Sequence, residues 1–146
     1  MDNQQGKIYW LGGFFDGECH IGITVKENPS GSTYLIPMIE VSNTHVPSID
    51  RIIKIASELE LPYYVMDRSN GSNPKWREQR RFSVQGMKRC EKWLDFLIPV
   101  LFTKLDQALL LKEIITLHKT RATGVQITPL VLEKIAELKR LNKRGN

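Results

Sequence analysis

The 146-residue chain has little cysteine and no long apolar run. Its two cysteines, Cys19 and Cys90, stand alone, without the spacing of zinc ligands or of a disulfide framework. No apolar stretch approaches the roughly 20 residues that a membrane-spanning helix needs. The N-terminus also lacks the basic start and apolar core of a secretory signal. We therefore expect an intracellular protein in a reducing compartment, with no zinc site and no membrane partner.

Length and composition indicate one globular domain over residues 1–146. Hydrophobic residues make up 41% of the chain and charged residues 25%. A chain of this size buries about two thirds of its unfolded surface and needs no disulfide or metal to fold. The sequence contains no second copy of any motif described below.

The net charge of +5 is concentrated in one segment. Residues 66–92 hold eight basic residues against three acids: Arg68, Lys75, Arg77, Arg80, Arg81, Lys88, Arg89 and Lys92. If these side chains share one face, that face attracts phosphates. The alternative is an ordinary solvated surface, and the residues alone leave both interpretations open.

Residues 8–18 predict an apolar helix with two adjacent glycines at its centre. Gly12 and Gly13 each cost roughly 1 kcal/mol relative to alanine, so close approach of another helix is the expected compensation. Gly17 suits the end of a helix and leaves Glu18 beside the negative end of the helix dipole. A carboxylate in that position favours a cation nearby.

The run Leu11 to Glu18, Leu-Gly-Gly-Phe-Phe-Asp-Gly-Glu, resembles the signature helix of the LAGLIDADG homing endonucleases. Cys19 departs from that motif, which usually ends in glycine. Without the resemblance, the same residues describe a buried helix with a glycine C-cap followed by an exposed glutamate.

The rest of the chain predicts two hairpins, each followed by helices. The expected strands are 20–26, 33–42, 61–68 and 76–85, and the expected helices after the first are 48–60, 87–97, 104–119 and 128 to about 141. Pro37 predicts a bulge or an edge position, and Ser48 a helix cap. Thr128 and Pro129 are typical of a helix start.

The resemblance implies an α+β fold with the element order αββαββα. In that family a curved antiparallel sheet lies on the DNA duplex like a saddle, and helices cover its back. Members with a single motif act as homodimers. The resemblance therefore implies a two-fold contact between signature helices through Leu11, Gly12, Gly13 and Phe15.

Metal-dependent hydrolysis of the DNA backbone needs hard oxygen ligands. The resemblance assigns Glu18 and the backbone carbonyl of Gly17 as ligands of Mg²⁺ or another divalent cation such as Mn²⁺, with one Glu18 from each subunit. Glu18 is longer than the commoner aspartate, which affects the metal geometry. Asp16 has no catalytic role in this interpretation and is expected to be structural.

Two further catalytic candidates follow from the resemblance. Asn43 stands where family members carry a glutamine that orders water, although a turn-forming asparagine explains it equally well. Lys104 matches a catalytic lysine that polarises a water or stabilises the scissile phosphate. Some family members carry a further basic residue just beyond the position of Asn43. His45 and Arg51 lie near that position, but the resemblance does not single out either, and neither is assigned to the catalytic site.

Strand alternation, combined with the family layout, predicts the side chains that face DNA. Most of them carry polar or charged groups that can hydrogen-bond to base edges or phosphates. The predicted set is Thr24, Lys26, Asn28, Met38, Glu40, Ser42, Arg68, Arg77, Gln79, Arg81 and Ser83.

The sequence therefore predicts an intron-encoded, site-specific endonuclease that makes a metal-dependent double-strand break in a long, near-palindromic DNA target. The main alternative is a non-cleaving nucleic-acid binder of the same fold, either an intron RNA maturase or a DNA-binding regulator. Retention of Glu18 argues against a dead site. A structural dimerisation module is the third interpretation. The expected location is a prokaryotic cytoplasm or nucleoid, or the interior of an organelle.

Overall fold

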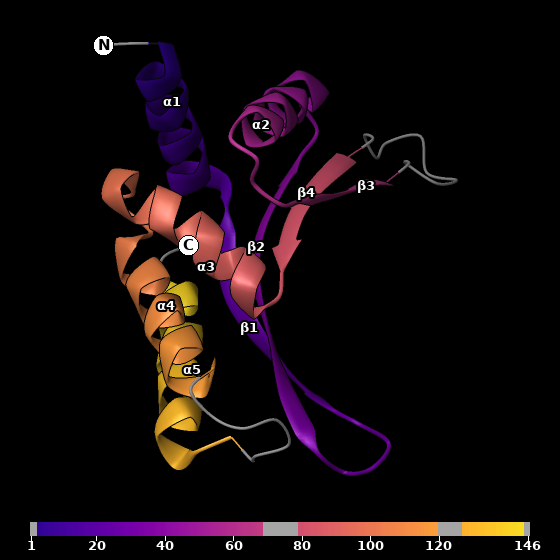
Figure 1. Cartoon of the computed structure of the whole chain (residues 1–146), viewed down its shortest axis with the longest axis vertical. Helices are drawn as coiled ribbons and strands as arrows, with labels where there is room; N and C mark the ends of the chain where they lie inside the picture. The colour runs from indigo at the N-terminus through magenta and orange to yellow at the C-terminus, as the bar shows by residue number, and fades with distance from the viewer. Residues whose placement is uncertain (1–2, 69–78, 120–126, 145–146) are drawn as a thin grey trace.

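The computed structural model describes residues 3–68, 79–119 and 127–144. Its elements, shown in Figure 1, follow the predicted order: α1 (Asn3–Glu18), β1 (His20–Glu27), β2 (Thr33–Asn43), α2 (Val46–Glu58), β3 (Tyr64–Arg68), β4 (Gln79–Gln85), α3 (Met87–Leu97), the 3₁₀ turn η1 (Ile98–Val100), α4 (Leu105–Lys119) and α5 (Pro129–Arg144). The first helix begins five residues earlier than predicted. None of the described helices is long and apolar enough to cross a membrane.

The four strands form one antiparallel sheet in the order β1-β2-β4-β3. Its inner face, which carries Ile21, Ile23, Leu35, Ile39, Val41, Phe82 and Val84, is buried against the helices. Its outer face carries the alternate residues of each strand, most of which are at least partly exposed. The predicted alternation along β2 and β4 is confirmed.

The helices lie on the inner side of the sheet, as Figure 1 shows. An aromatic cluster joins them to it: the Phe15 ring of α1 stacks on Trp93 of α3 at 5.3 Å between centroids, and both meet Phe82 of β4 edge-on. All three side chains are fully buried. The Trp93 indole N–H donates to the carbonyl of Pro62 at 2.6 Å, which satisfies its one polar atom. This packing fixes the end of α1 against the sheet.

The bulge predicted at Pro37 is absent. The β1–β2 register passes without interruption through the Ile23–Pro37 pair, and β2 is a central strand. The carbonyl of Pro37 accepts the Gly86 N–H at 3.0 Å. In an antiparallel strand the N–H and C=O of one residue point to the same side. The missing N–H therefore faces the side where β4 has already ended, and no ladder bond is lost.

The helix cap predicted at Ser48 is also wrong. Helix α2 begins at Val46 with Pro47 in its first turn, where a missing N–H costs nothing. His45 occupies the cap position, and its ring Nδ1 lies 2.6 Å from the Ser48 hydroxyl. The Thr128 cap is confirmed, because its hydroxyl accepts the Val131 N–H at 3.2 Å.

Candidate functional site

The candidate site is built around the junction between α1 and β1. Glu18 is the last residue of α1 and its side chain is exposed. The Phe15 carbonyl accepts the Cys19 N–H at 2.9 Å, while the last carbonyls of a helix generally have no partner within it. Apart from its neighbouring residues and the backbone of its own helix, no described atom lies within 4 Å of the position that a Cβ on Gly17 would take. The junction therefore presents the Glu18 carboxylate to the outside, next to the exposed Gly17.

Asp16 holds the segment before α4 against this junction. Its carboxylate accepts the backbone N–H groups of Phe102 at 3.0 Å, Thr103 at 2.9 Å and Lys104 at 2.8 Å. Burial raises the pKa of Asp16, but these hydrogen bonds outweigh burial and bring the pKa below its usual value. Asp16 thus has the structural role that the sequence predicted.

The hydrogen bonds from Asp16 bring Lys104 to the end of α1. Only 6% of Lys104 is exposed, and its charge acts on Cys19, the residue that follows Glu18. Burial raises the pKa of the Cys19 thiol to about 12, while the charge of Lys104 opposes this rise. Cys19 is therefore a protonated, inert thiol at neutral pH. The Lys104 backbone is thus bound to Asp16, two residues before Glu18, and the Lys104 charge acts on the residue that follows Glu18.

Asn43 is the last residue of β2, at the end of the sheet where α1 leads into β1. The β1–β2 register begins at the His20–Glu40 pair, so the last residues of β2 extend past the start of β1 toward α1. The side-chain oxygen of Asn43 accepts the His45 N–H at 2.8 Å, which is a typical turn at the start of a helix. This contact favours the turn-forming interpretation of Asn43.

Most of the predicted DNA-facing residues with described side chains lie on the outer face. Thr24 and Lys26 of β1, Met38, Glu40 and Ser42 of β2, and Gln79 and Arg81 of β4 alternate with the buried inner-face residues. Arg68 pairs with Gln79 in the backbone register. Arg77 lies outside the described residues. Asn28 closes the β1–β2 turn, where its amide donates to the Ser32 hydroxyl at 2.9 Å.

Ser83 is a correction to the predicted set, because only 1% of it is exposed. Its hydroxyl donates to Glu40 at 3.1 Å, and the Gln85 amide lies within 3.4 Å of the same carboxylate oxygen. Ser83 lies on the outer face in register, but its neighbours cover it. Its hydroxyl is engaged by the Glu40 carboxylate, so Ser83 is a supporting residue of Glu40 in this structure.

His20 was missed by the sequence prediction, although strand alternation places it in line with Thr24 and Lys26. The side chain is exposed on the outer face directly after the Glu18 junction. Its ring lies over Gly22, where a Cβ would come within 2.6 Å of His20 Nε2. Gly22 therefore leaves room for the imidazole to lie along the strand.

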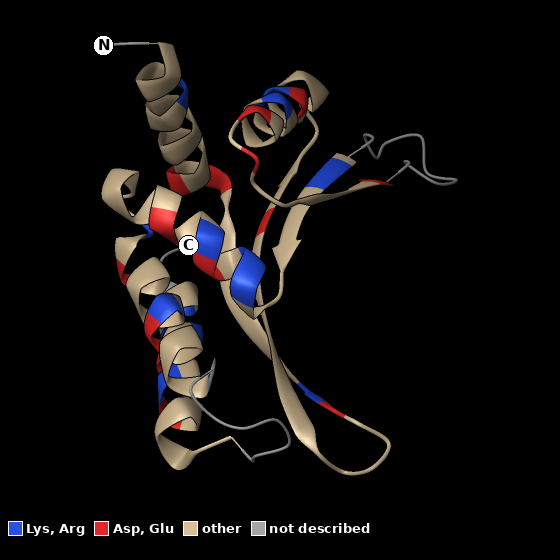
Figure 2. Cartoon of the chain, in the orientation of Figure 1, with Lys and Arg blue, Asp and Glu red and all other residues tan. Residues whose placement is uncertain are grey.

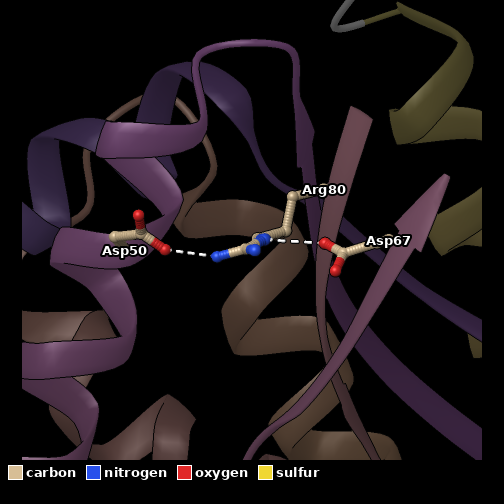
Figure 3. Close-up of polar contacts among 3 residues, drawn as sticks. All are labelled: Asp50, Asp67 and Arg80. Carbon is tan, nitrogen blue, oxygen red and sulfur yellow. Dashed lines mark hydrogen bonds and ion pairs between the residues drawn. The ribbon is translucent and has the colours of Figure 1, made fainter. Parts of the chain in front are cut away.

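The basic residues of segment 66–92 do not share one face. Figure 2 shows basic positions on β4 and on α3, which packs against the inner side of the sheet. Arg80 points inward, where it pairs with Asp50 of α2 and with Asp67 of β3, as drawn in Figure 3. Lys92 donates to the carbonyl of Glu60 at 2.9 Å. Among the described basic side chains that this segment places on the sheet, Arg81 is the one on the outer face.

Comparison with solved structures relates this geometry to a known fold. The homing endonuclease I-CvuI, in complex with target DNA and Mg, matches with a TM-score of 0.70 and 24% identity over 98% of this chain and 83% of that chain. The chain has the LAGLIDADG homing endonuclease fold. The LAGLIDADG homing endonuclease I-SmaMI, bound to cleaved DNA, matches with a TM-score of 0.70 and 17% identity over 95% of this chain and 44% of that chain.

The archaeal intron-encoded homing endonuclease I-Vdi141I, complexed with DNA, matches with a TM-score of 0.62 and 14% identity over 97% of this chain and 99% of that one. No protein-family model and no curated protein sequence matches the chain. The predicted α+β architecture is therefore confirmed as a LAGLIDADG homing endonuclease fold.

The LAGLIDADG-type helix α1 exposes a different set of residues from the predicted dimer contact. Leu11, Gly12 and Phe15 are buried inside this chain. A Cβ on Gly12 would lie 2.3 Å from Val100 Cγ2, so Gly12 is needed for packing against η1. Gly13 is exposed and has no neighbour within 4 Å of a Cβ position. Only Gly13 of the predicted four is open to a partner.

Proposed function

We propose that this chain is a homodimeric, site-specific DNA endonuclease that makes a metal-dependent double-strand break in a near-palindromic target. The observation that carries the proposal is the exposed Glu18 at the start of the sheet, in a segment whose Asp16 binds the Lys104 backbone and whose Cys19 feels the Lys104 charge. The same fold occurs in I-CvuI and I-SmaMI, both of which were solved with DNA.

The outer face is the proposed DNA interface. Lys26, Gln79 and Arg81 supply charged and amide donors, and Glu40 supplies an acceptor suited to the amino group of cytosine. Arg81 Nε lies 3.4 Å from the Ser42 hydroxyl, which leaves its remaining donors available. Phosphate contacts set register and affinity, while the base-edge contacts set sequence preference.

Glu18 and the Gly17 carbonyl are the proposed metal ligands, because hard carboxylate and carbonyl oxygens suit Mg²⁺ or Mn²⁺. Within the described part of the chain, no group of three or more His, Cys, Asp or Glu side chains could hold a metal by itself. Mg²⁺ sites commonly combine one or two carboxylates with substrate phosphates. When bound, such an ion would activate water and offset charge on the scissile phosphate. One Glu18 from each subunit would supply these one or two carboxylates.

Lys104 is the proposed electrostatic group of the site. A cation held in place by burial and by the backbone contacts to Asp16 loses little freedom when charge develops on the phosphate. Asn43 keeps a secondary role. Its oxygen is engaged by the His45 N–H, so its amide N–H₂ is the group that would orient water or phosphate.

The homodimer is proposed to form through the exposed face of α1. Gly13 and Gly17 lie four residues apart, on the same side of the helix, and neither has a neighbour over its Cα. Two such helices can approach closely, which brings both Glu18 side chains to one duplex. The target is then nearly palindromic, because its reader is symmetric.

The test is Mg²⁺-dependent cleavage of a randomised near-palindromic duplex library by the protein and by Glu18→Gln. We expect a cut in each strand at selected sites with the protein, and retention of the same sites without cutting by the variant. Glu27→Gln, an exposed acid at the far end of β1, is the matched control and should cut normally. Specific retention without cutting by the unaltered protein would instead indicate a DNA-binding regulator.

A further inference from the structure

Phe102 is the most exposed large hydrophobic side chain among the described residues, with 89% of its surface accessible. The next most exposed is Tyr64, which is 61% exposed and lies on the outer face of the sheet. Phe102 belongs instead to the short segment between η1 and α4, beside α1. An apolar ring displayed so fully is a typical anchor of a protein contact.

The backbone that carries Phe102 is firmly held. Its N–H donates to the Asp16 carboxylate at 3.0 Å, and the two following residues donate to the same carboxylate. Two residues earlier, Val100 packs tightly over Gly12. Presentation of the ring therefore costs little ordering entropy on association. Phe102 lies on the Asp16 flank of α1.

The opposite flank of α1 borders a cleft against α2. Its lining includes Gly6, Lys7, Trp10, Arg51, Lys54 and Glu58, and Lys7 pairs with Glu58 at 2.5 Å. The Arg51 guanidinium lies 4.7 Å from the centre of the Trp10 ring, and Trp10 also stacks on Phe14 at 5.3 Å. Because Glu58 neutralises Lys7, the cleft offers an aromatic wall at Trp10 and a basic rim formed by Arg51 and Lys54.

Helix geometry relates the two flanks. At about 100° per residue, Asp16 and Trp10 lie about 60° to either side of Gly13. Both Glu18 residues must reach one duplex, so the two α1 helices of the proposed dimer run in the same direction. A two-fold axis along such a pair places the Asp16 flank of one helix beside the Trp10 flank of the other.

We propose that Phe102 of each subunit packs into the partner's cleft between α1 and α2, against Trp10. This inference rests on the homodimer of the proposed function. Because the dimer is symmetric, the contact is reciprocal and two Phe102 rings are buried per dimer. The contact also explains why this apolar ring is exposed in a single chain. Phe102 becomes the main anchor of the dimer, beside the glycine contact.

The first test is sedimentation of the DNA-free protein across a concentration series. Phe102→Ala should raise the dimer dissociation constant at least about 100-fold, because each dimer loses two buried rings. The melting temperature at concentrations where the protein is monomeric should not change, since the ring is exposed there. Leu130→Ala, which truncates a half-exposed residue of α5, is the control and should dimerise normally.

A charge-reversal pair tests the location of the contact. Phe102→Lys places a cation against the basic rim and should abolish dimerisation. Lys54→Glu, combined with Phe102→Lys, should restore it by pairing across the interface. Within one chain, α2 and the segment between η1 and α4 lie on different sides of α1 (Figure 1). Failure of the double variant to recover, with Phe102→Ala dimerising normally, overturns the inference.

The outcomes separate this inference from the proposed function. A monomeric unaltered protein, both free and on DNA, would contradict the proposed homodimer itself. A dimer that is insensitive to Phe102 substitution contradicts only the anchor. Normal dimerisation of Phe102→Ala with loss of DNA affinity would assign the ring to DNA and would likewise overturn the contact proposed here.

Discussion

The carboxylate of Asp16 accepts the backbone N–H of Lys104 at 2.8 Å across 88 residues of sequence. Together with the hydrogen bonds from Phe102 and Thr103, this contact ties the segment before α4 to the end of α1. It therefore positions two residues with different proposed roles: the buried Lys104, and the exposed Phe102 ring on the flank of the helix. Asp16 is a structural residue on which both proposed surfaces depend.

The first prediction concerns Asp16 and pH. The hydrogen bonds favour the charged carboxylate and lower its pKa in the folded protein, so they stabilise the fold above the pKa of the unfolded chain. This stabilisation is lost as the pH falls through the folded-state pKa. Asp16→Asn should lose roughly 1–2 kcal/mol of unfolding free energy at pH 7.

Urea unfolding at a series of pH values checks this prediction. The difference between the protein and Asp16→Asn should be full at neutral pH and shrink below about pH 4, the usual range for an aspartate. Glu27→Gln is the control and should follow the unaltered protein throughout. A difference that is the same at pH 3 and pH 7 would count against a charge-assisted contact.

The second prediction separates the two adjacent glycines. Gly12→Ala places a methyl group 2.3 Å from Val100 Cγ2 and 3.1 Å from the Val100 carbonyl, so unfolding should become easier by about 1–3 kcal/mol. Gly13→Ala meets no described atom within 4 Å outside its neighbouring residues and helix backbone, so it should leave the monomer as stable or stabilise it by up to about 1 kcal/mol.

Thermal melts and sedimentation distinguish these effects. Gly12→Ala should melt earlier, and Gly12→Ala combined with Val100→Ala should recover part of the loss. Gly13→Ala should melt normally as a monomer but dimerise more weakly. Equal stability of Gly12→Ala and the unaltered protein would mean that Val100 moves aside at no cost.

Local patterns were sufficient to predict the elements, because strand alternation and helical spacing depend on neighbours in sequence. Leu35, Ile39 and Val41 were correctly assigned to one face of β2 on this basis. The contact of Asp16 with Lys104 could not be predicted, since it depends on how η1 packs on α1. The burial of Ser83 depends on its neighbours Glu40 and Gln85. Gly12 was assigned to a partner helix for the same reason: a glycine shows that something approaches, but not which segment.

The third prediction contrasts two neighbouring arginines. Arg80 points inward to Asp50 and Asp67, whereas Arg81 lies on the outer face next to Ser42. Arg81→Ala should weaken DNA binding and reduce the slope of log affinity against log salt by about one, if it contacts a phosphate. Arg80→Ala should lower thermal stability and leave that slope unchanged. Titration of one duplex at several salt concentrations gives both slopes, and a reversed pattern would place the interface on the inner face.

The last prediction concerns Lys104. Only 6% of the residue is exposed and its charge acts on the residue next to Glu18, so we expect it to contribute to the proposed reaction electrostatically and not to target affinity. Lys104→Met keeps the length and packing of the side chain but removes the charge. We expect the single-turnover cleavage rate to fall at least about 100-fold while target retention changes less than about 3-fold, because substrate binding uses the outer face.

Lys104→Arg keeps the charge but enlarges the buried head group, so it should retain more activity than Lys104→Met if it folds. Thermal melts of both variants distinguish a lost charge from a lost fold. A cleavage rate of Lys104→Met equal to that of the unaltered protein would show that the lysine only fills the space between Asp16 and Cys19.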